Sequence, residues 1–292
     1  MEFCKLKIQY FFLQFMKITL FIKRSFLAGN LYQFISVFSI LFLMNHCILF
    51  AQDKANTYVA THEDSIALEN VIVEKYYVAD TSDYSEHSVS PLPKGSITYR
   101  IFIDMKPNYN LQMVYGNQNH ELFFETSTRV FNDIEADAIT GFNVDLKKLN
   151  KGNVALDSWV TMGAACRGFT GIPRVEDTSK YSLISNRPSL NKSDGLIKGV
   201  LPDFVPFNLD LTFFNNDSTA KRFATTNGAW ASPGGVKGPT AENRVLIAQL
   251  TTDGKLSFQL NVQIGTPTGG YIQFVAYKQQ GQEIEFKGLS YK

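Results

Sequence analysis

The stretch Ser96-Ile97-Thr98-Tyr99-Arg100-Ile101-Phe102-Ile103-Asp104 decides the fold. Apolar side chains recur there at every second position, as Ile97, Tyr99, Ile101 and Ile103. The positions between them are polar except for Phe102, namely Thr98, Arg100 and Asp104. A period of two places alternate side chains on opposite faces of a β-strand. The stretch therefore predicts an antiparallel strand with one face in the core and the other in water.

The same alternation extends over Leu256–Ile264. Other short segments are rich in β-branched and aromatic residues and are bounded by turn formers. They are Val71–Val78, Leu111–Tyr115, Glu121–Phe131, Ser158–Met162, Phe207–Phe214, Arg244–Leu250, Tyr271–Tyr277 and Glu283–Phe286. We find no helical period of apolar residues over three turns. The prediction is an all-β fold of about ten strands, an antiparallel two-sheet β-sandwich or jelly roll.

Two connections carry further expectations. Asp253-Gly254 is the strongest turn signal in the chain, and it predicts a hairpin between Arg244–Leu250 and Leu256–Ile264. The stretch from Gly163 to Pro206, rich in Gly, Pro, Ser and Asn, is too long for a plain connection. It is expected to be either a functional loop system at one end of the sandwich or a pair of irregular edge strands.

The first residues resemble an export signal. Residues 1–51 combine a basic start, an apolar run over Phe34–Met44 and a small residue, Ala51, and they predict a signal peptide cleaved after Ala51. Met16 is an equally good start. An uncleaved anchor is disfavoured because Asn45 interrupts the apolar run before the ~20 residues that a span needs. A lipidated Cys47 is also disfavoured, since a small residue does not precede it.

We therefore expect residues 52–66 to form a polar lead-in and residues 67–292 a single β-sandwich domain. The whole chain is nearly balanced, with 28 Lys and Arg against 27 Asp and Glu. Removing the leader, which is basic, leaves a slight acidic excess. No basic patch then suggests nucleic acid, and no membrane insertion is expected after cleavage. Cys166 becomes the sole cysteine, so the fold must be stabilised by its core.

Catalytic signatures are scarce. The pattern Gly-x-Ser-x-Gly does not occur, and the mature chain holds only three histidines. His62 and His87 lie in polar surroundings typical of loops, and His120 is interpreted as flanking a turn. Cys166, beside two alanines, is expected to be a small buried apolar residue rather than a nucleophile. Dispersed histidines and one cysteine match no zinc pattern.

Paired carboxylates leave one enzymatic alternative open. Glu283 and Glu285 are two residues apart on a predicted strand, so their side chains share a face about 7 Å apart. That separation is compatible with glycoside hydrolysis. Glu121 and Glu125 raise the same question. The competing interpretation is a solvated strand edge.

Two binding devices remain as candidates. Asp80, Asp83 and Glu86 cluster in a turn-rich segment and form a weak candidate calcium site, because hard cations prefer clustered oxygens. Asn215, Asn216 and Asp217 are a similar cluster. Trp230 is flanked by Gly and Pro, and it either plugs one end of the core or stands exposed on a loop, where it would stack on a sugar. We select Trp230 as the candidate ligand-binding residue.

Two motifs, Asp157-Ser158-Trp159-Val160-Thr161-Met162-Gly163 and the stretch from Asn243 to Gly254, resemble a family of uncharacterised exported bacterial β-sandwich proteins. The similarity covers most of Glu69–Tyr291 and implies no activity. Relatives continue after a segment like Phe286–Tyr291 into a sorting domain of the type IX secretion pathway. This chain stops at Lys292, so the resemblance does not imply surface display, and periplasmic location and release by another route both stay open.

Together these observations predict an exported, periplasmic or extracellular module without catalytic activity and without a cofactor other than calcium. Loops on a rigid sandwich are where such a module would bind a partner. Glycan binding through Trp230 and neighbouring loops is the first expectation. The alternatives are adhesion to an envelope or extracellular protein, or matrix assembly, and a polysaccharide hydrolase that uses paired carboxylates.

Overall fold

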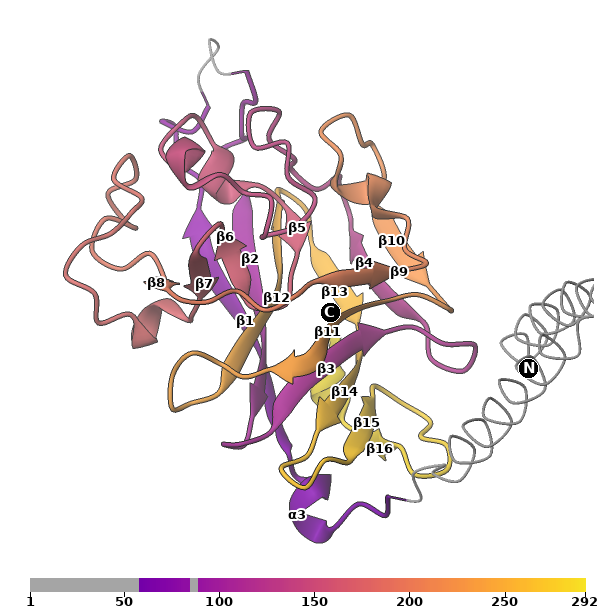
Figure 1. Cartoon of the computed structure of the whole chain (residues 1–292). Coiled ribbons are helices and arrows are strands. Elements are labelled where there is room, and N and C mark those ends of the chain that lie inside the picture. Colours follow the sequence, from indigo (N-terminus) through magenta and orange to yellow (C-terminus); the bar gives the residue numbers. More distant parts are fainter. Residues whose placement is uncertain (1–57, 85–88) are drawn as a thin grey trace, which may run out of the picture. The chain divides into compact units, whose positions relative to one another are not determined.

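Strands β2 (Ile97–Met105) and β12 (Arg244–Thr252) pair antiparallel at the centre of the computed structural model, which describes residues 58–84 and 89–292. With β1 (Leu68–Val78) and β5 (Trp159–Val160) they form the central sheet, in the order β1-β2-β12-β5 (Figure 1). The strand predicted over Ser96–Asp104 is confirmed. Its alternating side chains give the central sheet two chemically different faces.

Three further sheets complete the all-β fold, which the sequence predicted correctly. The six-stranded sheet has the order β16 (Ile284–Glu285), β15 (Tyr271–Val275), β14 (Asn261–Gly265), β3 (Asn110–Tyr115), β11 (Ala229–Val236), β9 (Val205–Phe207). The outer four-stranded sheet has the order β10 (Arg222–Thr225), β4 (Leu122–Thr126), β13 (Leu256–Gln259), β17 (Ser290–Tyr291). The three-stranded sheet consists of β6 (Ala164–Cys166), β7 (Phe169–Gly171) and β8 (Leu196–Lys198).

The pairing is antiparallel apart from β15 with β16 and one isolated bridge. The expected ten strands are too few, because several strands are only two or three residues long. The helices of the described residues are short: α3 (His62–Ser65) and the 3-10 turns η1 (Leu146–Lys148), η2 (Val154–Leu156), η3 (Arg174–Glu176), η4 (Leu211–Phe214) and η5 (Lys287–Leu289).

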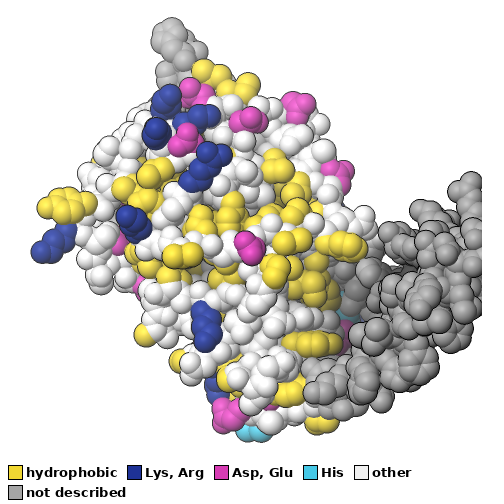
Figure 2. Space-filling view, in the orientation of Figure 1, with side chains coloured by type: hydrophobic (Ala, Val, Ile, Leu, Met, Phe, Trp, Pro, Cys, Tyr) yellow, Lys and Arg dark blue, Asp and Glu magenta, His cyan; other side chains and the backbone are white. Residues whose placement is uncertain are grey.

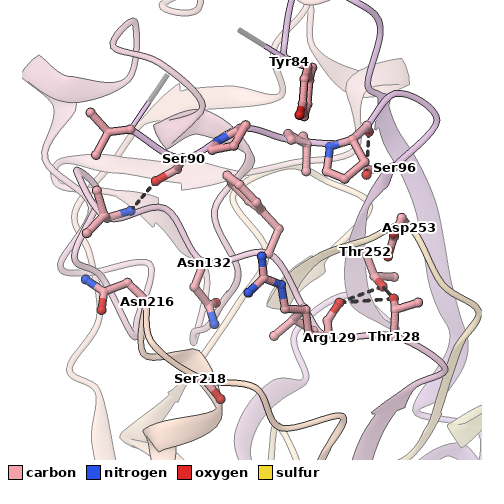
Figure 3. Close-up of a pocket in the computed structure, with 17 residues that line it drawn as sticks. Tyr84, Ser90, Ser96, Thr128, Arg129, Asn132, Asn216, Ser218, Thr252 and Asp253 are labelled. Atoms are coloured by element: carbon pink, nitrogen blue, oxygen red, sulfur yellow. Dashed lines mark hydrogen bonds between the residues drawn. The ribbon is translucent and has the colours of Figure 1, made fainter. Parts of the chain in front are cut away.

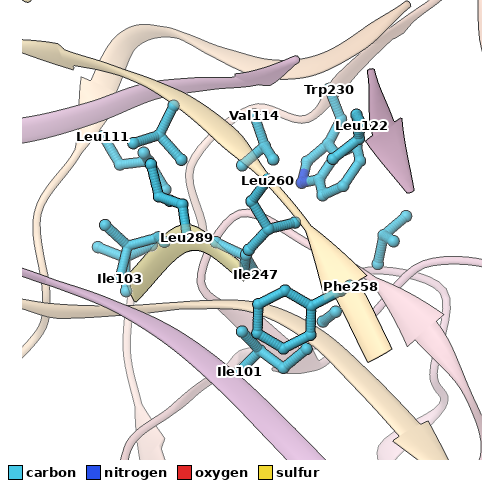
Figure 4. Close-up of a cluster of buried hydrophobic side chains, with 14 of the residues drawn as sticks. Ile101, Ile103, Leu111, Val114, Leu122, Trp230, Ile247, Phe258, Leu260 and Leu289 are labelled. Atoms are coloured by element: carbon cyan, nitrogen blue, oxygen red, sulfur yellow. The ribbon is translucent and has the colours of Figure 1, made fainter. Parts of the chain in front are cut away.

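The main core lies against the apolar face of the central sheet. Ile101 and Ile103 of β2 and Ile247 of β12 contribute to it, together with side chains from the six-stranded and outer four-stranded sheets (Figure 4). All three isoleucines are fully buried. Burial of such side chains stabilises the fold by about 1.5–3 kcal/mol each relative to exposure. This part of the molecule is the sandwich that the alternation predicted.

The polar face of β2 is also buried, contrary to the expectation of a face in water. Thr98 and Phe102 are 0% exposed, and Arg100 is 2% exposed. A second core covers this face, and it contains Phe102, Leu246, Trp159 and Cys166. The three-stranded sheet lies within residues 163–206, so this stretch is neither a plain loop nor an edge extension. It supplies part of the layer over the central sheet.

Polar side chains on this covered face satisfy one another. The side chain of Gln249 donates to the carbonyls of Ala155 and Asp157, at 3.1 and 2.7 Å. Thr251 Oγ1 donates to Thr98 Oγ1 at 2.8 Å. Buried polar groups cost free energy unless they are hydrogen-bonded, and this network removes that cost.

Three expectations about the strands are wrong. Leu256–Ile264 is not one strand, because it divides into β13 and β14, which belong to different sheets. The Asp253-Gly254 turn does not close a hairpin, because β12 belongs to the central sheet and β13 to the outer four-stranded sheet. The turn instead carries the chain from one layer to the other. Phe207–Phe214 is not a strand either. Only Val205–Phe207 pairs, as β9, and Leu211–Phe214 forms η4 after Asp210, whose carboxylate accepts from the Thr212 amide.

The compact unit begins at Tyr58, before the boundary expected at residue 67. Thr61 caps α3, and the Asp64 carboxylate accepts hydrogen bonds from Tyr58, Thr61 and Tyr109. Part of the expected polar lead-in is thus packed against the sheets. The predicted signal peptide over residues 1–51 lies outside the described residues.

Candidate functional site

Trp230 is buried in the main core, so the expectation of an exposed ring on a loop is wrong. It lies within β11, is 0% exposed, and its Nε1 donates to the carbonyl of Thr161 at 3.0 Å. The rings of Phe124 and Phe223 pack beside it, with centroids 6.3 and 6.5 Å away. Neither the ring face nor the indole N–H is open to a sugar. The core alternative for Trp230 is the one that the structure supports.

The carboxylates of the calcium candidates Asp80 and Asp83 form hydrogen bonds or ion pairs with other groups of the protein. Asp83 is buried, and its carboxylate accepts from the Tyr77 hydroxyl at 2.8 Å and from the Asp80 amide at 2.9 Å. It also pairs with Arg187 at 3.2 Å. The Asp80 carboxylate accepts from the amide and hydroxyl of Ser82. Glu86 lies outside the described residues, and the described ones contain no group of three metal-binding side chains.

The carboxylate pair is similarly engaged. Glu283 Oε2 lies 2.8 Å from His120 Nε2 and accepts from the Gln280 amide. Glu285 Oε2 accepts from the Lys278 amide at 2.9 Å. Both carboxylates therefore hold the loop that leads into β16. Glu121 and Glu125 pair with Arg222 across strands β4 and β10.

The side chain of His120 is buried, which its sequence context did not indicate. Its side chain is 0% exposed, and its ring meets Tyr277 edge to face. The Nδ1 atom has no hydrogen-bond partner among the described residues, nor has the nearby hydroxyl of Tyr115. Burial, with the charge of Glu283, raises the pKa of Tyr115. The turn-flanking interpretation accounts for the position of His120 in the chain but not for its burial.

Cys166 is buried in the second core, and burial raises the pKa of its thiol to about 12. The thiolate is the reactive form, so this cysteine is a packing residue, as expected. His62 is exposed in α3, and His87 lies outside the described residues. No catalytic constellation of the kinds considered is assembled among residues 58–84 and 89–292.

A pocket of about 440 Å³ lies where the loops at one end of the sandwich meet (Figure 3). Its walls come from the segments that precede β2, follow β4, follow η4 and follow β12. The turn at Asp253 contributes to this wall because it crosses between layers instead of closing a hairpin. The lining residues are Tyr84, Val89, Ser90, Pro91, Leu92, Pro93, Ser96, Thr128, Arg129, Val130, Phe131, Asn132, Ile134, Asn216, Ser218, Thr252 and Asp253.

Hydrogen bonds fix the backbone of the pocket. Thr128 Oγ1 and Thr252 Oγ1 lie 2.9 Å apart and both donate to the carbonyl of Arg129 (Figure 3). Asn132 ties the β4 side to the η4 side by donating to the carbonyls of Phe213 and Asn215, at 3.0 and 2.9 Å. The pocket is therefore held by side chains from several loops and is pre-formed.

Other polar side chains at the pocket form no hydrogen bonds with the described residues. The side chains of Tyr84, Arg129, Asn216 and Asp253 are exposed and have no hydrogen-bond partner within the part of the chain that the structure describes. Tyr84 is 54% exposed, and Val89 and Ile134 add apolar surface at 66% and 49%. Aromatic and apolar surface beside unengaged polar groups is typical of a small-molecule binding site.

Sequence reasoning singled out none of Tyr84, Arg129 or Asp253 as ligand-binding, although it marked Asn216 and the Asp253-Gly254 turn. The available signal was the set of turn formers at Asn215–Asp217 and Asp253-Gly254. It did not indicate that these turns meet at one end of the sandwich.

No helix in the described residues is long and apolar enough to cross a bilayer. Comparison with protein-family models, with curated proteins and with solved structures gave no match to this chain. The resemblance to exported bacterial proteins therefore stays a prediction, and the candidate site depends on its geometry alone.

Proposed function

We propose that this protein is an exported, non-catalytic binding module that recognises a glycan in the pocket between Tyr84 and Arg129. One observation carries the proposal: an exposed tyrosine ring stands at a pocket of about 440 Å³ whose guanidinium, Asn216 amide and carboxylate groups are unengaged among the described residues. The leader predicted over residues 1–51 favours action in the periplasm or outside the cell.

The chemistry of the pocket matches that of a sugar ring. A pyranose has C–H faces that pack on an aromatic ring and hydroxyl groups that both donate and accept hydrogen bonds. Asn216 offers a donor and an acceptor, Arg129 donors and Asp253 an acceptor. The pocket is open and polar, so it suits a hydroxylated ligand better than a fully apolar one. Trp230 takes no part, in contrast to the first expectation.

A glycan array of bacterial, plant and animal oligosaccharides tests the proposal. Tyr84→Ala is compared with Tyr181→Ala, which removes a tyrosine that is 85% exposed but does not line the pocket. We expect Tyr84→Ala to weaken binding about tenfold, because it removes a stacking surface. Tyr181→Ala should bind like the wild type. Failure of the chain to bind any glycan, or equal loss in both variants, would overturn the proposal.

A second candidate function, contact with an envelope or extracellular protein, is favoured by an apolar surface elsewhere. Figure 2 shows hydrophobic side chains gathered across the middle of one face. In the segment leading into β9 and in β9 itself, Val200, Val205 and Phe207 are 98%, 46% and 55% exposed. Exposed apolar surface of this kind is found at protein interfaces. Replacing Val205 and Phe207 by Thr should abolish such a contact and leave glycan binding unchanged.

Pro206 limits how that contact forms. β9 is an edge strand of the six-stranded sheet, and edge strands can pair with another chain through their backbone. Pro206 lies opposite Trp230 and has no N–H to donate. Strand addition at this edge is therefore disfavoured, and a partner would be held by side chains.

The hydrolase alternative has weaker support. Glu283 and Glu285 are hydrogen-bonded to the loop at residues 278–280, and neither lines the pocket. Replacing both by Gln should leave glycan binding unchanged. Release of reducing sugar ends by the wild type, lost in that double variant, would support the hydrolase instead.

A further inference from the structure

Arg129 projects its side chain into the pocket from a fixed backbone. Its carbonyl accepts hydrogen bonds from Thr128 Oγ1, in the same segment, at 3.3 Å and from Thr252 Oγ1, at the end of β12, at 3.1 Å, and the second bond anchors the residue to β12. Figure 3 shows the guanidinium extending away from these bonds, and the residue lines the pocket. Only the side chain is therefore free to meet a ligand.

The guanidinium of Arg129 lacks the partners that most other arginines have. Arg187, Arg222 and Arg244 form ion pairs with carboxylates. Arg174 donates to three backbone carbonyls, and Arg100 donates to Gln249 and lies over the ring of Tyr76. Among the described residues, only Arg129 and Arg167 form no such interaction. Arg167 does not line the pocket.

We propose that the glycan bound in this pocket is acidic, and that its carboxylate or sulfate group binds the guanidinium of Arg129. This inference rests on the proposed function. A guanidinium presents parallel N–H donors that match the two oxygens of a carboxylate or of a sulfate. A carboxylate of the protein within ion-pair distance would compete for these donors, and the described residues place none there.

Asp253 sets a limit on the ligand. Its side chain lines the same pocket and forms no ion pair with any described Lys, Arg or His. The carboxylate therefore repels a negatively charged ligand group. A glycan with one acidic group placed at Arg129 and neutral hydroxyls toward Asp253 fits better than a densely charged polymer. Asp253→Asn removes this repulsion without changing the shape of the side chain, so it should strengthen binding of the acidic glycan.

Binding to matched oligosaccharides tests the inference by calorimetry. The probes are an oligosaccharide of neutral sugars that carries one glucuronic acid and its methyl ester, and a monosulfated disaccharide and its desulfated form. The wild type should bind at least one acidic member about tenfold more tightly than its neutral partner, and the preference should shrink as salt is raised. The pair that shows the preference identifies the carboxylate or the sulfate as the recognised group.

Variants assign the preference to one side chain. Arg129→Gln should abolish it by lowering the affinity for the acidic member to that for its neutral partner, and Arg167→Gln, a matched exposed arginine, should keep it. Equal affinity for acidic and neutral members, or a preference that survives Arg129→Gln, would overturn the inference. Neutral glycans that still bind through Tyr84 would then leave the proposed function intact, whereas binding of no glycan at all would contradict both.

Discussion

Arg100 Nε donates a 2.9 Å hydrogen bond to Gln249 Oε1 across the β2–β12 pair, on the face of the central sheet that sequence periodicity assigns to water. The guanidinium carbon lies 3.6 Å from the centroid of the Tyr76 ring, and Nη1 donates to the carbonyls of Asp194 and Gly195. Arg100 therefore attaches the segment around β8 to the central sheet. This attachment gives the molecule a covering layer beyond the sandwich.

Replacing Arg100 by Met should destabilise the fold by at least about 2 kcal/mol, because Gln249 Oε1 and two carbonyls would lose their donor in a buried site. The matched control is Arg222→Met, at a surface ion pair with Glu121, where the loss should be under about 1 kcal/mol. Urea unfolding measures both. Equal midpoints for the two variants would show that the Arg100 network does not stabilise the covering layer.

Trp230→Ala should cost about 3–5 kcal/mol, since it opens a cavity in the main core and removes the hydrogen bond to Thr161. Trp230→Phe keeps most of the ring volume and should cost less. Thermal unfolding followed by circular dichroism compares the two. A Trp230→Ala protein as stable as the wild type would contradict the burial of this ring in the main core.

Asp64 should stabilise the start of the domain at neutral pH. Hydrogen bonds from Thr61, Tyr58 and Tyr109 outweigh burial and lower the pKa of this carboxyl from 3.8 to about 2. A lowered pKa contributes stability that is present above the unfolded-state value and lost as pH falls through the folded-state value. Asp64→Asn should remove about 2 kcal/mol at neutral pH.

The control for Asp64 is Asp210→Asn, at an exposed carboxylate whose pKa is lowered by hydrogen bonds from Thr212. Its effect should be much smaller, because solvent screens the interaction. Acid unfolding curves test the pair. If Asp64→Asn and the wild type unfold at the same urea concentration at neutral pH, the cap at Asp64 contributes nothing.

Asp157 should have the opposite pH dependence. Burial raises the pKa of this carboxyl well above 3.8, although the amide of Asp133 donates to it at 2.7 Å. A raised folded-state pKa gives stability that is complete below the unfolded-state pKa and lost as pH rises through the folded-state value. Asp157→Asn should flatten this loss. We expect the wild type to gain melting temperature as the pH falls toward the unfolded-state pKa of the carboxyl, and the variant to gain less. An unchanged slope would show that the Asp157 carboxyl is not the titrating group.

The sequence predicted most of the fold because alternation is a local property of a strand. Alternate residues of β2 lie on opposite faces, as the sequence alternation predicts. The same alternation in other segments predicts the all-β class. Alternation does not reveal what covers the second face. Polar residues such as Arg100 and Thr98 give the same sequence pattern whether they face water or hydrogen-bond to Gln249 and Thr251. The partner residues are far away in the chain, so the local sequence around β2 does not identify them.

The candidate site was less predictable than the fold. Asp253-Gly254 has the turn chemistry of a hairpin, but long-range pairing places β12 and β13 in different sheets. Tyr84, Arg129 and Asn216 come from separate loops, and only the folded chain brings them to one pocket. Trp230 shows the converse error, because flanking Gly and Pro residues suggested a loop where β11 pairs with β3 and β9.

Hydrogen–deuterium exchange of the chain with and without the best-binding glycan tests the central claim most directly. Binding in the pocket should slow exchange in the segments around Arg129–Asn132 and Asn216–Ser218, and leave β9 and β16 unchanged. Protection confined to Val205–Phe207 or to Ile284–Glu285, with the pocket segments unaffected, would contradict the assignment of the glycan site to the pocket between Tyr84 and Arg129.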